Sequence, residues 1–158
     1  MTSDGDLESL AAELKRLRDI EEIKQMRGRY CRLIDSKQFQ AWGELLTEDF
    51  HAVTEGGVQD GRDVAVAFLS KSLAEATTVH HCHTPEITFT GEGTATGIWA
   101  MQDHVKLSIG GSPVAFRGAG HYYDVYVRTP DGWRVKSTEL RRLSVDMLEG
   151  KFPSRPES

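Results

Sequence analysis

The N-terminal part of the chain carries apolar side chains at helical spacing. Four leucines recur at steps of three and four residues: Leu7, Leu10, Leu14 and Leu17. This spacing predicts an amphipathic helix with a narrow apolar stripe. Because such a stripe has to be covered, it favours contact with another subunit of an oligomer.

A second helix is predicted directly after the first. Asp19 is a candidate N-cap, and Glu22 follows three residues later at the capping-box spacing. This helix is expected to end near Asp35. Helical spacing also predicts a short helix over 39–46 and another helix over 62–73.

After residue 73 the pattern changes from helical spacing to alternation. Turns rich in glycine and proline separate four predicted strands, at 85–90, 94–107, 114–128 and 133–143, and a short strand is predicted earlier, at 50–53. Helices followed by a long antiparallel sheet indicate the α+β class. Long strands curl, and a curled sheet with helices on its concave side encloses a cavity.

Length and charge limit the classes of function. The chain has 158 residues and fits one domain, expected over residues 1–150 with a disordered tail at 151–158. A formal charge of −5 argues against a nucleic-acid partner, because phosphate binding needs clustered cations. No apolar run is long enough to cross a membrane. We therefore expect a cytoplasmic protein with no membrane partner.

Two cysteines and one basic cluster are interpreted as structural features. Cys31 and Cys82 lack the spacing of a disulfide framework or a zinc knuckle, so they are expected to be free thiols in a reducing compartment. Four basic residues mix with Glu139 and indicate a solvated strand face: Arg134, Lys136, Arg141 and Arg142.

The densest group of reactive side chains is the run from His80 to His83, which enters a predicted strand. Alternation places His83 on one face with Ile87 and Phe89, so its imidazole is expected to point into the core. Imidazole exchanges protons near neutral pH, which makes His83 a candidate general base. The alternative is a core histidine held by one hydrogen bond.

Asp103 is a second candidate, because it shares a predicted strand face with Trp99, Met101 and Val105. An unpaired carboxylate is costly to bury, so a functional site or a strong ion pair is expected there. The alternative is an aspartate at a strand end or bulge that reaches water.

Asp35 and Tyr30 lie on the predicted second helix. Asp35 at the helix C-terminus meets the negative end of the helix dipole, and such local conflicts are typical of functional sites. Asp-Ser-Lys is equally an ordinary turn. Tyr30 is on the inward side of the helix, where its hydroxyl can reach a ligand or complete a hydrogen bond in the core.

A metal site is disfavoured. His81 and His83 share a strand face and can chelate one ion, but Glu86 has the opposite parity and points away from it. His121 shares a face with Tyr123 and serves equally as a further ligand or as a pocket wall. The sequence contains no Gly-x-Ser-x-Gly motif and no glycine-rich phosphate loop.

Several of these features occur together in a known family. They are the Tyr30…Asp35 pair closing a helix, the run His83–Ile87 opening a strand, and Ala95-Thr96-Gly97 leading to Trp99 and Asp103. The chain thereby resembles the scytalone dehydratase and SnoaL-like branch of the nuclear-transport-factor-like superfamily, over roughly residues 15–145. Within that branch it is most similar to the bile-acid 7α-dehydratases.

This resemblance implies a cone-shaped, mixed sheet and a metal-free elimination that needs no cofactor. Four catalytic residues are implied: Tyr30, Asp35, His83 and Asp103. His83 would take a proton from carbon, Asp35 would stabilise the imidazolium, and Tyr30 or Asp103 would assist departure of a hydroxyl. The Asp…His pair also resembles the dyad of the lindane dehydrochlorinase.

The implied substrate is a small hydrophobic molecule of polycyclic, steroid-like or polyketide-like type, and the implied assembly is a homotrimer. Five side chains are expected to line the cavity: Trp42, Phe89, Trp99, Met101 and His121. Two alternatives remain. One is an isomerase or cyclase that uses the same base without a leaving group, and the other is a non-catalytic ligand-binding module.

Overall fold

Three helices and six strands make up the fold in the computed structural model, which describes residues 4–152. The helices are α1 (Asp4–Asp35), α2 (Phe39–Gly43) and α3 (Arg62–Ser72). The strands are β1 (Leu46–Thr54), β2 (Gly57–Asp60), β3 (Thr77–Gly91), β4 (Thr94–Ile109), β5 (Ser112–Thr129) and β6 (Gly132–Glu149).

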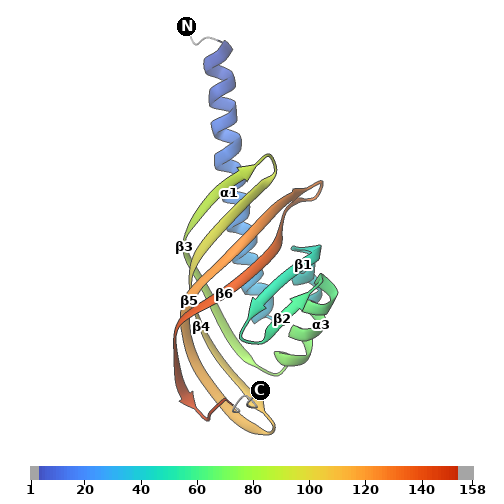
Figure 1. The fold of residues 1–158 in the computed structure, drawn as a ribbon, viewed down its shortest axis with the longest axis vertical. Helices are drawn as coiled ribbons and strands as arrows, with labels where there is room; N and C mark the ends of the chain where they lie inside the picture. The colour runs from blue at the N-terminus through green and yellow to red at the C-terminus, as the bar shows by residue number, and fades with distance from the viewer. Residues whose placement is uncertain (1–3, 153–158) are drawn as a thin grey trace.

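The strands form a single curved sheet in the order β2-β1-β6-β5-β4-β3 (Figure 1). All neighbours are antiparallel except β1 and β6, which pair in parallel. The second half of α1 contacts β3 and β6, so the helix covers the concave side of the sheet. This arrangement confirms the predicted α+β class and the mixed, curved sheet.

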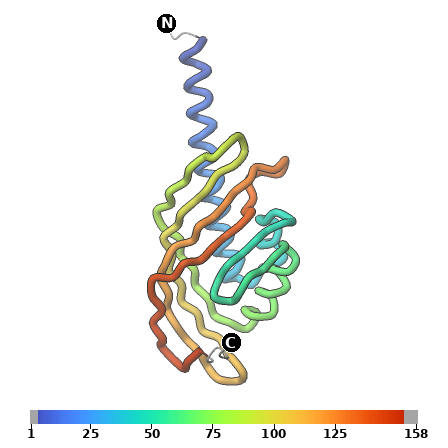
Figure 2. Tube along the Cα trace, in the orientation of Figure 1, coloured from blue at the N-terminus to red at the C-terminus, as the bar shows by residue number. Residues whose placement is uncertain are grey.

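Helix α1 is longer than predicted, because the two expected N-terminal helices are one continuous helix. The expected break at Asp19 is wrong: the side chain of Asp19 is buried and forms ion pairs with Lys15 and Arg128 instead of capping a helix. The N-terminal half of α1 projects beyond the sheet (Figure 2). Its leucine stripe is exposed there, from 52% at Leu7 to 63% at Leu17.

A β-bulge interrupts β3 at Thr84 and Pro85. His83 pairs with Ala100 and Glu86 pairs with Ile98, so three steps along β3 match two steps along β4. Thr84 has φ of 31°, which is unusual for a residue with a side chain. The bulge shifts the phase of alternation by one residue.

This phase shift decides which histidines face inward. Ile87 and Phe89 pack against the core, as predicted, but the residues before the bulge that share their face are His80 and Cys82. His83 is exposed on the convex face. The prediction that His83 points into the core is therefore wrong, because simple alternation does not hold across a bulge.

The core lies between α1, α2 and the concave face of the sheet. Strand β2 was not predicted, because Gly56-Gly57 and Asp60-Gly61 at its two ends are typical of turns. Beyond β6, the ring of Phe152 packs on Phe116 with centroids 5.1 Å apart, and residues 153–158 of the predicted tail lie outside the described part. No helix among residues 4–152 is long and apolar enough to cross a membrane.

Candidate active site

A cavity of about 850 Å³ opens between the end of α1, α2, α3 and the concave face of β3 to β6. Most of its wall is apolar, including Ile34, Phe50, Leu69, Val105, Phe116 and Leu140. Polar side chains gather on one part of the wall, where His80, Asp103 and Arg142 line the cavity. An apolar cavity with a few convergent polar groups is typical of a small-molecule site.

Asp35, the last residue of α1, forms a dyad with His80 of β3. Its Oδ1 lies 2.7 Å from His80 Nδ1, and its Oδ2 accepts the His80 backbone N–H at 2.9 Å. Thr78 Oγ1 donates to Asp35 Oδ1 at 2.9 Å and accepts from Lys37 Nζ at 3.0 Å. Because Nδ1 donates to the carboxylate, Nε2 of His80 carries the free lone pair of the neutral ring.

The same contacts keep Asp35 charged. Partial burial opposes ionisation, but the hydrogen bonds from the ring and the backbone of His80 and from Thr78 outweigh it and hold the pKa of Asp35 below its ordinary value. These donors also compensate for the negative end of the α1 dipole. A fixed carboxylate behind an imidazole stabilises the imidazolium that forms when the ring accepts a proton.

Asp103 and Arg142 form a buried bidentate ion pair in the cavity wall. Arg142 Nη1 and Nη2 donate to the two carboxylate oxygens at 2.9 and 2.6 Å, and the side chain of Asp103 is 2% exposed. Arg142 Nε also pairs with Glu55 at 2.9 Å. Burial lowers the pKa of Arg142, but Asp103 and Glu55 outweigh it, so the net shift is upward. The strong ion pair expected at Asp103 is confirmed.

The pair lies beside the dyad, because Asp103 is the register partner of His80. The interpretation of Arg142 as part of a solvated face is wrong: a register shift in β6 turns this side chain inward, where it is 13% exposed. Gly118 of β5 makes the space for it. A methyl group on Gly118 would overlap Arg142 Nη1 and lie 2.6 Å from Asp103 Oδ1.

Tyr30 and Trp42 line the cavity, on the wall opposite the sheet. Their rings pack edge to face with centroids 5.3 Å apart. Burial raises the pKa of Tyr30, so its hydroxyl keeps its proton at neutral pH. Trp42 is 2% exposed, and its indole N–H has no hydrogen-bond partner among residues 4–152.

Four residues expected in the cavity wall lie elsewhere. Phe89, Trp99 and Met101 face inward as predicted, but they belong to the core at the level where α1 covers the sheet. Trp99 Nε1 donates there to the hydroxyl of Tyr126 at 2.8 Å. His121 alternates with the buried Tyr122 and therefore lies on the convex face.

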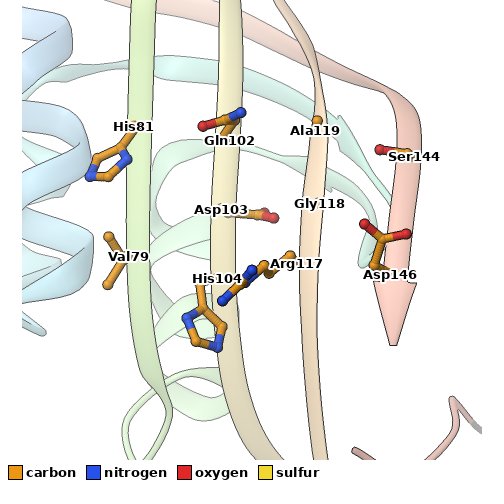
Figure 3. Close-up of a pocket in the computed structure, with 10 residues that line it drawn as sticks. All are labelled: Val79, His81, Gln102, Asp103, His104, Arg117, Gly118, Ala119, Ser144 and Asp146. Carbon is orange, nitrogen blue, oxygen red and sulfur yellow. The ribbon is translucent and has the colours of Figure 1, made fainter. Parts of the chain in front are cut away.

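His83 is not brought together with Asp35, Tyr30 or Asp103. Its ring lies 6.0 Å from that of His81 on the convex face. A second hollow on this face, of about 490 Å³, is lined by His81, His104, Arg117 and other side chains from β3 to β6 (Figure 3). Within the described part of the chain, no group of three or more His, Cys, Asp or Glu residues is placed to hold a metal ion.

Sequence reasoning missed His80 and Arg142. His80 could have been found because it lies on the same strand face as Thr78. Side chains on that face can approach Asp35, the carboxylate at the end of the preceding helix. The signal for Arg142 was the expected buried Asp103, because a buried carboxylate needs a cation as its partner.

Comparisons with known proteins agree with this fold. The sequence model of a protein family, the SnoaL-like domain, matches residues 15–139. A curated relative, Probable cyclase FGR4 of Gibberella zeae, is 23% identical over 138 residues, which is 80% of this chain and 92% of the relative.

Solved structures show the same fold. A hexachlorocyclohexane dehydrochlorinase, LinA type 2, superposes with a TM-score of 0.77 at 19% identity and covers 91% of this chain and 98% of its own. A candidate scytalone dehydratase of Novosphingobium aromaticivorans has a TM-score of 0.72 at 20% identity, with coverages of 86% and 91%. These two structures show the fold, and the match to the SnoaL-like domain agrees with the predicted branch. The finer similarity to bile-acid 7α-dehydratases stays a prediction.

Proposed function

The chain belongs to the SnoaL-like domain family, and on that premise we propose that it is a cofactor-free dehydratase, a carbon–oxygen lyase. The observation that carries this proposal is the Asp35–His80 dyad, whose imidazole lies in the wall of an apolar cavity next to the Asp103–Arg142 ion pair. The dyad replaces the Asp35–His83 pair expected from the sequence. Dehydratase and dehydrochlorinase names among the structural neighbours support an elimination.

The proposed reaction uses one base and one acid. His80 Nε2 takes a proton from a carbon next to a carbonyl group, and Asp35 stabilises the resulting imidazolium. Arg142 places positive charge where the carbonyl oxygen becomes negative. Tyr30, which is protonated at neutral pH, donates its proton to the departing oxygen, and the proton that His80 took from carbon restores Tyr30 after the reaction. The C–H and C–O bonds break, a C=C bond forms, and water leaves.

The cavity supports a hydrophobic polycyclic substrate of steroid-like or polyketide-like type. Its volume of about 850 Å³ lies in the upper part of the usual range for small-molecule sites, about 300–1,000 Å³.

A cyclase or isomerase is the second candidate, and the similarity to Probable cyclase FGR4 favours it. Such an enzyme needs the same proton transfer to His80 but no leaving group. Mass spectrometry of the products separates the two reactions, because a dehydratase product has lost water and an isomerised or cyclised product has not.

The test is a panel of 3-oxo steroids and polyketide-type β-hydroxy ketones incubated with the wild type and with His80→Ala. We expect loss of water from at least one substrate, catalysed by the wild type and strongly reduced in the variant. A protein that binds these ligands equally well with or without the imidazole, and converts none of them, would be a binding module.

We also propose a homotrimer in which the projecting half of α1 packs on other copies of the chain. Its exposed leucines follow the a/d spacing of a coiled coil. Glu13 and Arg18 flank this stripe at positions that attract each other between parallel helices. Light scattering of the wild type and of Leu10→Ser/Leu14→Ser tests the proposal, and a monomeric wild type at working concentration contradicts it.

A further inference from the structure

A pair of thiols lies on the same two elements as the dyad, one helical turn before Asp35 and two residues after His80. Cys31 of α1 and Cys82 of β3 are distant in sequence, but their Sγ atoms are 3.5 Å apart. Cys31 is buried, Cys82 is partly exposed, and neither is in a disulfide. Both cysteines lie outside the residues that line the cavity, so the proposed elimination does not use them.

A buried cation faces this pair. Arg27 is fully buried between the rings of Tyr30 and Tyr122, at 4.2 and 4.1 Å from their centroids. Its nearest carboxylate, Asp124, is 3.4 Å away and already accepts two hydrogen bonds from neighbouring hydroxyls at 2.6 Å each. None of the three guanidinium nitrogens has a hydrogen-bond partner among residues 4–152. This cation is therefore only partly compensated.

The two thiols are electrostatically different. The hydrogen bond from Cys31 and the charge of Arg27 outweigh burial and lower the pKa of Cys82. The same hydrogen bond, together with burial, raises the pKa of Cys31. Cys82 is also the partly exposed thiol of the pair, so a peroxide reaches it first, and the buried Cys31 is the one that follows.

We propose that Cys82 and Cys31 form a redox site that reduces a hydroperoxide and closes into a disulfide between α1 and β3. The Cys82 thiolate attacks the peroxide oxygen, the O–O bond breaks, and Cys82 becomes a sulfenic acid. The departing oxygen takes up the proton that the Cys82 thiol had released, and an alcohol or water leaves. The sulfur of Cys31 then attacks Cys82, the S–O bond breaks, and water leaves with the proton of Cys31. Two thiols are oxidised and one peroxide is reduced.

The disulfide acts on the dyad, a consequence that rests on the proposed function. Cys31 precedes Asp35 by one helical turn, and Cys82 follows His80 by two strand residues. A disulfide needs about 2.05 Å between the sulfurs, so they have to approach by about 1.5 Å. The new bond ties α1 to β3 one helical turn from Asp35, and it removes the Cys82 thiolate that faces Arg27.

The experiment treats the reduced full chain with hydrogen peroxide, alkylates it, and measures intact mass and free thiols. The wild type should lose both thiols within one chain and regain them with a phosphine reductant. Cys31→Ala and Cys31→Ser should stop at a sulfenic acid on Cys82, trapped by dimedone, whereas Cys82→Ala should trap none. Two free thiols in wild type after peroxide treatment, or a disulfide between chains, overturns the proposal.

The effect on the dyad is measured without substrate, from the NMR signals of the His80 ring in the reduced and the oxidised protein. We expect the signals to differ between the two forms, and to be unaffected by peroxide in Cys82→Ala, which forms neither a sulfenic acid nor a disulfide at this site. Identical signals in the two forms overturn the link to the dyad. If the disulfide forms and the His80 signals change but no substrate is converted, the redox site stands and the proposed elimination fails.

Discussion

The concave and convex faces of the sheet carry the same kinds of residue in different chemical situations. His80 and His83 lie three residues apart in β3, yet His80 is held by Asp35 in a cavity wall and His83 is exposed beside His81. In β6 the neighbours Arg142 and Arg141 differ in the same way. Arg142 binds the buried Asp103, whereas Arg141 binds the exposed Glu139.

This contrast teaches that residue type alone does not locate the site. A histidine or an arginine gains chemical importance here only where burial removes water and a fixed partner sets its charge. The first consequence is that matched substitutions on the two faces should differ greatly in effect.

The largest difference should separate His80→Ala from His83→Ala. Loss of a general base costs roughly 10²–10⁴-fold in turnover, so His80→Ala should fall in that range with the fold intact. His83→Ala should stay within about twofold of the wild type, since exposed side chains away from a site change little. Steady-state kinetics with thermal melts checks both variants. A severe loss in His83→Ala would favour the pairing first expected from the sequence.

A double-mutant cycle sharpens the same comparison. Asp35→Asn should also lower turnover, because the imidazolium loses its carboxylate. The losses in Asp35→Asn and His80→Ala should not add, since both remove one proton transfer. Fully additive losses would mean that Asp35 acts independently of His80.

The next largest difference concerns stability. Arg142→Met leaves the buried carboxylate of Asp103 unpaired and should cost about 3–5 kcal/mol of unfolding free energy. Arg141→Met should leave that free energy nearly unchanged, because its ion pair is exposed. Urea unfolding at neutral pH measures both. Recovery in Asp103→Leu/Arg142→Met would assign the cost to the unpaired charge, and its absence would point to lost packing.

Alanine substitutions at two glycines should change the unfolding free energy by smaller amounts and in opposite directions. Gly118→Ala should destabilise by about 1–3 kcal/mol, because the added methyl displaces the Asp103–Arg142 pair. Gly28→Ala on α1 meets open space and should stabilise by about 0.5–1 kcal/mol through helix propensity. Chemical denaturation of both variants is the measurement, and equal effects would refute the steric role of Gly118.

The smallest effect should be on acid stability. The pKa of Asp35 in the folded protein lies below that of the unfolded chain, about 3.9. Its charged form therefore stabilises the fold above about pH 4, and this contribution is lost as the pH falls through the folded pKa. Thermal melts from pH 7 to pH 3 should show a flatter acid decline in Asp35→Asn. Asp63→Asn, at an exposed position, should follow the wild type.

Much of the fold could be predicted from the sequence, because amphipathic periodicity reports directly on which face of an element is buried. The helix over 62–73 and the hairpins after residue 91 follow this rule closely. Asp19 shows where local sequence patterns are not sufficient. An aspartate followed three residues later by a glutamate fits a helix N-cap, but it also fits a helix interior in which the aspartate forms a buried ion pair. Only contact with Arg128, which is distant in the sequence, distinguishes the two.

The site could be predicted only in part. Tyr30 and Asp103 lie in the cavity wall on the faces that local periodicity predicts, and Asp35 lies at the end of its helix, as predicted; their catalytic roles stay predictions. His80 and Arg142 were missed, since their orientation depends on register shifts that arise from pairing with other strands. The extent of the cavity could not be predicted either. Met101 faces inward, as alternation predicts, but it packs in the core, and strand alternation does not show where a helix covers the sheet.

Because of the bulge at Thr84 and Pro85, the number of residues in β3, rather than their types, decides which side chains face the core. A one-residue deletion there would restore uniform alternation, and half of β3 would have to exchange its two faces. The chain would then either bury His83 and expose His80, or keep His80 and turn Ile87 and Phe89 out of the core. Homologous strands that differ by one residue at this point are therefore expected to position different histidines without any change in the residues themselves.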